Sequence, residues 1–138
     1  MSQSDVTMST VTIHNPAEPR HFMRIKPVNR RIRVLLGDEI LAETTHALRI
    51  MEVGKDFYDP VIYVPEGDIR AALRRIDHQT HCPLKGDASY FDLTDTGGNV
   101  RQEKIAWSYA DAFDFAAELK GHIAFAPNLV TVEDAPLN

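Results

Sequence analysis

The residues best suited to chemistry in this chain lie close together, between His78 and Tyr90. This segment reads His-Gln-Thr-His-Cys-Pro-Leu-Lys-Gly-Asp-Ala-Ser-Tyr and includes the single cysteine of the chain. A cysteine beside histidine and lysine is the setting in which a thiol loses its proton and becomes a nucleophile. A lysine followed by glycine offers a point charge and an open backbone, which suit a phosphate or a carboxylate. The segment therefore predicts catalysis or the binding of an anion.

Each of these groups has a role that its chemistry suggests. Cys82 or His81 would act as nucleophile or base, and Tyr90 would orient a substrate or donate a proton. Lys85 would hold an anionic group, with Gly86 giving that group room at the backbone. The glycine-rich run that precedes the lysine of a P-loop is missing, so the segment does not match that phosphate-binding motif. The catalytic candidates are therefore His81, Cys82 and Tyr90, and the first ligand-binding candidates are Lys85 and Gly86.

The same segment raises the question of a metal ion. His78 and His81, followed by Cys82, come close to the ligand spacing of zinc sites. Neighbouring residues on a strand point to opposite faces, however, and a further ligand such as His46 or His122 would have to come from elsewhere in the chain. We therefore expect no metal ion and no cofactor, and His78 stays among the ligand-binding candidates.

A structural role for these residues is the open alternative. Cys82 would then pack as a small apolar side chain, and the histidines would form hydrogen bonds with the backbone. Lys85 would pair with a carboxylate such as Asp68 or Asp87, while Gly86 made a left-handed turn. Closed and buried packing would indicate this structural role, whereas convergence in an open concavity would indicate a site.

Composition excludes several classes of function. The formal net charge of -5 and the pI near 5.6 argue against a nucleic-acid-binding surface, which is normally basic. The sequence has no run of about 18 apolar residues, so no membrane-spanning segment is expected. The polar first residues lack the apolar core of a secretion signal, and one cysteine leaves no internal disulfide. We expect a cytoplasmic protein that binds neither nucleic acid nor a membrane.

Short apolar and β-branched runs separated by turn residues predict strands along most of the chain. Gly37-Asp38 joins two such runs and predicts a tight hairpin. Helical spacing predicts two short helices, over about 68–76 and about 112–120, each beginning at a capping aspartate, Asp68 and Asp111. The strands are expected at 22–25, 31–36, 39–43, 46–53, 61–64, 88–93, 100–108, 122–125 and 129–132.

These elements do not alternate as strand–helix–strand units, so the pattern does not indicate a parallel sheet. It predicts a mainly β fold, a small antiparallel bent barrel or sandwich with two short helices as plugs. The length of the chain favours one domain. We place that domain at residues 21–133, between a flexible N-terminal tail at 1–20 and a C-terminal tail at 134–138.

Several longer motifs resemble those of one known family. They are Tyr-Val-Pro-Glu-Gly-Asp at 63–68, His-Cys-Pro-Leu-Lys-Gly-Asp-Ala-Ser-Tyr at 81–90, Ala-Trp-Ser-Tyr at 106–109 and Ile-Ala-Phe-Ala-Pro at 123–127, together with His78. On these residues the chain, from about His21 to Val132, resembles the bacterial and fungal domain-of-unknown-function 427 family. The resemblance implies a small antiparallel fold of the β-tent type.

The resemblance carries further implications for the site. Many β-tent relatives hold zinc between paired Cys-x-x-Cys motifs, which a chain with one cysteine cannot supply. A nucleotidyltransferase-like label is also attached to the family, and that reaction needs carboxylates that share Mg²⁺. The nearest pair, Asp92 and Asp95, would face opposite sides of a strand. The chain departs from the family pattern at Ala126, where an aromatic residue is usual, and at Ala110–Phe113, where a proline is usual.

Aromatic side chains on the expected strands complete the candidate site. Trp107 and Tyr109 lie at positions i and i+2 and share one face of a strand. In a β-tent such faces surround a cleft, so Tyr63, Trp107 and Tyr109 are expected to wall a ligand pocket beside Lys85. Simple core packing is the alternative for these side chains.

Together these features predict a domain with a pocket for a small polar or anionic molecule, and they leave open whether it is an enzyme. The rival interpretation is a non-enzymatic structural or protein-interaction module, in which the His-Cys-Pro-x-Lys-Gly segment holds the fold together. Edge strands in so small a domain would also allow a homodimer.

Overall fold

Strands account for most of the fold, as the sequence predicts, and the computed structural model describes residues 12–137. The part of the expected N-terminal tail at residues 1–11 lies outside the described residues. Within residues 12–137 lie two 3₁₀-helices, η2 (Glu66–Asp68) and η3 (Asp114–Leu119). The strands are β1 (Ile13–Asn15), β2 (Glu18–Pro27), β3 (Arg31–Leu36), β4 (Glu39–Thr44), β5 (Leu48–Val53), β6 (Val61–Pro65), β7 (Leu73–Cys82), β8 (Gly86–Thr94), β9 (Val100–Ser108), β10 (His122–Phe125) and β11 (Thr131–Ala135).

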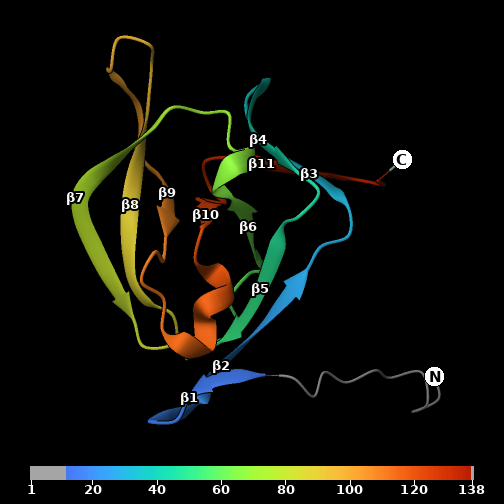
Figure 1. Cartoon of the computed structure of the whole chain (residues 1–138), viewed down its shortest axis with the longest axis vertical. Coiled ribbons are helices and arrows are strands. Elements are labelled where there is room, and N and C mark those ends of the chain that lie inside the picture. The colour runs from blue at the N-terminus through green and yellow to red at the C-terminus, as the bar shows by residue number, and fades with distance from the viewer. Residues whose placement is uncertain (1–11, 138) are drawn as a thin grey trace.

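The strands form two antiparallel sheets. The larger has eight strands in the order β1-β2-β5-β6-β10-β9-β8-β7, and the smaller has three in the order β11-β3-β4. The large sheet bends without closing into a barrel, so that β7, β8 and β9 lie across the molecule from β2 and β5 (Figure 1). The short helix η3, orange in Figure 1, lies between these two wings. The mainly β class is confirmed, and the bent sheet is consistent with the β-tent type.

Apolar side chains fill the space that the bend creates, and their burial supplies most of the driving force for folding. One cluster, which includes Met23, Ile50, Tyr63 and Leu84, draws its members from strands of both wings and from the turn between β7 and β8. A second cluster, which includes Leu41, joins the small sheet to the large one. No helix within residues 12–137 is long and apolar enough to cross a membrane.

The expected hairpin around Gly37-Asp38 is confirmed, with Leu36 paired to Glu39 and Gly37 at a φ of 60°. Strands extend beyond the expected domain limits at both ends, however. β1 and the start of β2 occupy residues 13–20, which were predicted to be a loose tail, and β11 continues to Ala135. The backbone pairing of Ile13 with Met23 explains the first difference, because polar composition does not prevent a segment from adding to a sheet edge.

The helix expected over 68–76 is wrong, since only η2 precedes the long strand β7. Ile69, Ala71 and Leu73 are partly buried against the core while their neighbours along the chain are more exposed. This period of two is the pattern of a strand. Pairing of Leu73 with Leu93 of β8 then extends the sheet along this segment.

The helix expected over 112–120 is present only as the six residues of η3, and its backbone is kinked at Ala116. Asp111 does not cap it, because the N-cap position is Phe113 and no side chain bonds there. Phe113 donates its backbone N–H to the carbonyl of Lys85 at 3.0 Å instead. The segment is therefore fixed by the β7–β8 turn and buries Ala116 and Leu119, which is enough for a short helix only.

Candidate functional site

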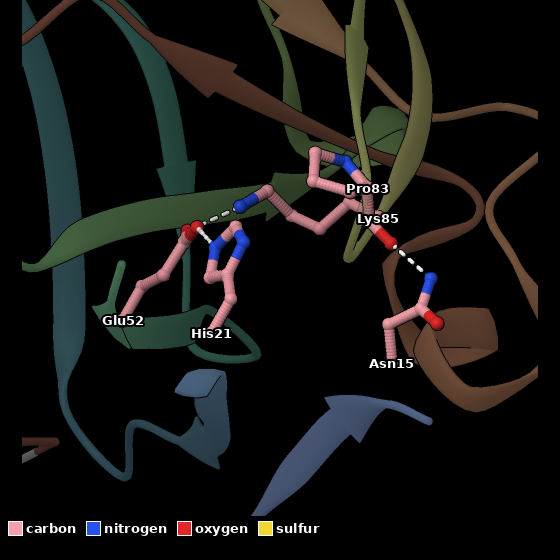
Figure 2. Close-up of polar contacts among 5 residues, drawn as sticks. All are labelled: Asn15, His21, Glu52, Pro83 and Lys85. Atoms are coloured by element: carbon pink, nitrogen blue, oxygen red, sulfur yellow. Dashed lines mark hydrogen bonds and ion pairs between the residues drawn. The ribbon is translucent and has the colours of Figure 1, made fainter. Parts of the chain in front are cut away.

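The segment from His78 to Tyr90 forms a β-hairpin. β7 and β8 pair up to Cys82 and Gly86, and these two residues bound what we call the β7–β8 turn (Cys82–Gly86). Leu84 in this turn is fully buried in the core. The Pro83 carbonyl accepts a hydrogen bond of 2.7 Å from the Asn15 side chain of β1 (Figure 2). The turn therefore spans the open side of the bent sheet and connects its two wings.

Gly86 has a structural role in this turn. Its φ of 114° is unfavourable for any residue with a Cβ, and a Cβ there would lie 3.3 Å from the carbonyl oxygen of Asp111. Gly86 is buried and is not among the residues that line the pocket described below. It makes room for the backbone before η3.

Lys85 crosses from the turn to the opposite wing. Its ammonium group pairs with the carboxylate of Glu52 on β5, and the same carboxylate accepts a hydrogen bond of 2.5 Å from Nε2 of His21 on β2 (Figure 2). The Lys85 side chain is 7% exposed and that of Glu52 13%. The ammonium also lies 5.7 Å from the centre of the Tyr109 ring, within range of a cation–π contact. This is the best-buried ion pair among the described residues.

The ionisation of Glu52 reflects two opposing effects. Burial acts to raise the pKa of its carboxyl group, since it penalises the charged form. The hydrogen bond and charge of Lys85, together with those of His21, outweigh burial and leave the pKa below its usual range. Glu52 is therefore a carboxylate at neutral pH and holds Lys85 in place.

Beside this ion pair lies a concave pocket of about 400 Å³, which we call the aromatic pocket. Its residues come from β5, β6, β8 and β9, from the β7–β8 turn, and from the connections that precede β6 and follow β9 and β10. They are Ile50, Glu52, Tyr58, Asp59, Val61, Tyr63, Lys85, Tyr90, Lys104, Trp107, Tyr109 and Ala126. Trp107 donates its indole N–H to the Tyr63 hydroxyl at 3.2 Å, and its ring centre lies 6.4 Å from that of Tyr90.

The buried tyrosines of this wall stay protonated. Burial raises the pKa of Tyr63 far above its usual value, and burial also raises that of Tyr109. Their hydroxyl groups can donate or accept hydrogen bonds but cannot act as bases near neutral pH. These two side chains are therefore suited to orienting a ligand.

The predicted site residues divide into two groups. Lys85, Tyr90 and the three expected wall residues line the aromatic pocket, while His78, His81, Cys82 and Gly86 do not. The ring of His78 contacts that of Tyr90 at 4.8 Å, and Tyr90 shares a hydrogen bond of 2.8 Å with Thr80. His78 and Thr80 thus support Tyr90 outside the lining, which is a positioning role.

His81 and Cys82 point in different directions, as adjacent strand residues do. His81 pairs with Asp87 at 2.8 Å, and both side chains are more than half exposed, so this histidine faces solvent away from Lys85. Cys82 is half-buried and lies near the ion pair, with its sulfur within 4.8 Å of a ring nitrogen of His21 and an oxygen of Glu52. The structure therefore directs His81 and Cys82 to opposite faces of β7, and Cys82 shares its face with Thr80, the hydrogen-bond partner of Tyr90.

The sequence analysis missed two residues of this site, His21 and Glu52. The alternation of residues along the two strands could have indicated them, because each lies on the inward face of its strand. Leu48, Ile50 and Glu52 alternate along β5, and His21 stands two residues before the buried Met23 on β2. An ionisable residue on the apolar face of an alternating strand needs a partner, and that requirement could have identified both.

The carboxylates nearest to a nucleotidyl-transfer pattern are both used elsewhere. Asp92 is buried and accepts a hydrogen bond of 2.9 Å from the backbone N–H of Lys104. Asp95 accepts hydrogen bonds from the backbone of Gly97 and Asn99 in the β8–β9 turn. These contacts give each carboxylate a structural role.

The fold and this arrangement define a small mainly β domain whose bent sheet is bridged by an ion-paired turn next to an aromatic pocket. The chain belongs to the family described as a domain of unknown function (DUF427), whose sequence profile matches residues 24–135. This match confirms the family that the motifs predict. A search of the curated proteins finds no match.

Proposed function

We propose that this protein binds a small molecule in the aromatic pocket, one that joins a flat apolar body to a polar or anionic end. The observation that carries the proposal is the placement of the Lys85–Glu52 pair. Lys85 is buried and the Glu52 side chain is only 13% exposed, yet both line a concavity walled by Tyr63, Trp107 and Tyr109. Pockets with apolar and aromatic walls and a few fixed polar groups are the usual form of small-molecule sites.

The two ends of the pocket suit different parts of such a ligand. Rings of Tyr90 and Trp107 offer stacking surfaces for a flat body. Lys85 donates and Glu52 accepts, so a polar group that does both would match the pair without leaving either unpaired. Lys104 and Asp59 also line the pocket, so its charged residues are balanced and suit a polar group that both donates and accepts hydrogen bonds.

The backbone of Lys104 supports its inclusion in the site. Its φ of 50° is uncommon for a residue with a side chain, and the bond from its N–H to the buried Asp92 holds it in that conformation. The register of β8 and β9 shifts between Leu93 and its neighbours, which marks an irregularity of the β-bulge kind. Bulges of this kind often redirect a side chain at the edge of a binding site.

Binding is better supported than catalysis. Of the three catalytic candidates, only Tyr90 lines the aromatic pocket. A structural role for the turn is compatible with binding. Within one turn, Leu84 and Gly86 hold the fold together while Lys85 faces the pocket.

The test uses Trp107, the only tryptophan of the chain, as a reporter inside the pocket wall. Small molecules that co-purify with the wild-type protein are identified by mass spectrometry and compared with those from Trp107→Leu and from the control Phe57→Ala. Phe57 is 84% exposed and lies outside the lining. We expect a compound enriched with wild type and with Phe57→Ala but lost with Trp107→Leu, and that compound should change Trp107 fluorescence on titration. Equal recovery from all three proteins would contradict the proposal.

The location and assembly of the protein are part of the same proposal. The free thiol of Cys82 supports a reducing compartment such as the cytoplasm. The exposed edges of the large sheet at β1 and β7 support a homodimer, which light scattering of the purified protein tests directly.

A further inference from the structure

A second cluster of reactive groups lies behind the Lys85–Glu52 pair. His21 of β2, Glu52 of β5 and Cys82 of β7 bring a ring nitrogen, a carboxylate oxygen and a sulfur within 4.8 Å of one another. All three residues are partly buried, and they come from three strands. The residues are far apart in sequence, so the fold alone assembles them.

We propose that His21, Glu52 and Cys82 form a binding site for a transition-metal ion, with zinc as the ion whose preferences fit best. Zinc binds imidazole nitrogen, carboxylate oxygen and thiolate sulfur, and three protein ligands leave one position open for water or another small ligand. Two ligand atoms on one tetrahedral zinc ion lie roughly 3.5 Å apart. The His21–Glu52 contact of 2.5 Å would open by about 1 Å, and the sulfur, which lies within 4.8 Å of both atoms, would complete the set.

Lys85 is compatible with this site because the Glu52 carboxylate has two oxygens. Lys85 pairs with Oε1, whereas Oε2 is the atom that faces His21. A metal ion at Oε2 would replace the hydrogen bond from His21 and leave the ion pair intact. Hydrogen bonds to the outer oxygen of a ligating carboxylate are common at metal sites and hold it in position. The negative charges of the carboxylate and a thiolate would balance the divalent ion.

The cluster also has its own access to solvent. An open hollow of about 650 Å³ lies on the His21 side, and both His21 and Pro83 line it. His21 is absent from the lining of the aromatic pocket. Glu52 belongs to both sites, but His21 and Cys82 are absent from the lining of the aromatic pocket, so the loss of metal binding and the loss of the pocket ligand are read out at different residues.

Cobalt(II) tests this proposal, because cobalt bound to a thiolate absorbs in the near ultraviolet and Cys82 is the only thiol in the chain. The full chain, freed of metal with a chelator, is titrated with Co²⁺ and then with Zn²⁺. We expect an absorption band that saturates at about one equivalent and disappears as zinc displaces cobalt, as for a single thiolate site. Absence of the band in the wild-type protein would overturn the proposal, whatever the variants do.

Variants assign the ligands. Cys82→Ser should abolish the band, and His21→Ala and Glu52→Gln should each weaken cobalt binding at least about 10-fold. The matched control is His81→Asn, because His81 faces solvent next to the same turn and should leave the affinity unchanged. Thermal melting of each protein shows that it is folded, and zinc should raise the melting temperature of wild type but not of Cys82→Ser. Equal cobalt affinity in wild type and His21→Ala would remove His21 from the site.

Discussion

Two ion pairs in this molecule use similar groups in opposite surroundings. Lys85 and Glu52 meet inside the bend of the large sheet, where their side chains are 7% and 13% exposed. Arg101 of β9 and Glu39 of β4 meet at the surface through two hydrogen bonds of 2.8 and 3.0 Å, with side chains 38% and 44% exposed. The surface pair has the better hydrogen-bond geometry, yet the interior pair connects the parts of the site.

The difference lies in what surrounds each charge. Water and salt screen an exposed pair, so its loss changes little. In the interior pair, either charge would be strongly destabilising if it lost its partner, because it is largely buried. The ion pair therefore ties the position of the β7–β8 turn to that of β5. The interior pair thus contributes positional order, and the surface pair contributes mainly solubility.

Removing one interior partner should have the largest effect. Lys85→Met leaves Glu52 partly buried with His21 as its remaining partner, and we expect the free energy of unfolding to fall by about 3 kcal/mol. The double variant Lys85→Met/Glu52→Gln should recover most of this loss, because no unpaired charge remains. Urea denaturation followed by circular dichroism measures both. If Lys85→Met were as stable as the wild-type protein, burial would not distinguish the interior ion pair from the surface ion pair.

The backbone of the β7–β8 turn should matter nearly as much as its ion pair. Gly86→Ala introduces a Cβ at a φ of 114° and 3.3 Å from the Asp111 carbonyl, and we expect a loss of about 2 kcal/mol. The matched control is Gly67→Ala, where no atom lies within 4 Å of the new Cβ and φ is not in the left-handed region. That control should keep wild-type stability in the same denaturation experiment. A tolerated Gly86→Ala would show that the turn is held by side chains alone.

The pH dependence of stability should distinguish the two carboxylates. The pKa of each is lowered in the folded protein, Glu52 by Lys85 and His21 against the effect of burial and Glu39 chiefly by its hydrogen bond to Arg101. A carboxyl group with a lowered folded pKa stabilises the fold above its unfolded value, near 4.3, and loses that contribution as the pH falls through the folded value. Stability of the metal-free protein should therefore decline as the pH falls below about 4.3.

Adding salt separates the contributions of these carboxylates. The Glu39 side chain is 44% exposed, so salt should screen its interaction with Arg101. The pH-dependent loss of stability that disappears in Glu39→Gln should therefore become smaller at high salt. The pH-dependent loss of stability that disappears in Glu52→Gln should persist at high salt. Denaturation series at several pH values, with and without salt, measure both parts. A decline that is equally sensitive to salt in the two variants would argue against the distinction.

The regular part of the fold could be predicted from local patterns. Alternation of apolar and polar residues placed the β3–β4 hairpin and most of the other strands correctly. It failed at residues 68–76, where Ile69 and Leu73 fit the spacing of a helix as well as that of a strand. Pairing with β8 makes this segment a strand. The spacing of residues within the segment contains no information about a partner 20 residues away.

The site was predictable to the extent that its residues are local. The motif at 81–90 contributes Lys85, and the aromatic residues of β6 and β9 were expected beside it. Glu52 lies 33 residues from Lys85 and 31 from His21, so only the bend of the sheet brings these three together. His81 was predicted to be catalytic because it lies in one segment with cysteine, lysine and tyrosine. Strand alternation turns its side chain to the face of β7 opposite to that of Cys82.

The smallest effect is expected at the surface pair. Arg101→Ala should leave the unfolding midpoint in urea unchanged within the error of the measurement, because solvent replaces the lost contacts of both side chains. A double-mutant cycle with Glu39→Gln should give a coupling energy close to zero in high salt, whereas the corresponding cycle of Lys85→Met and Glu52→Gln should keep a large one. If the surface cycle gave the larger coupling, hydrogen-bond geometry would outweigh burial in this fold. The interior pair would then owe its position to the packing of Leu84 and Gly86, and the turn would stay in place without it.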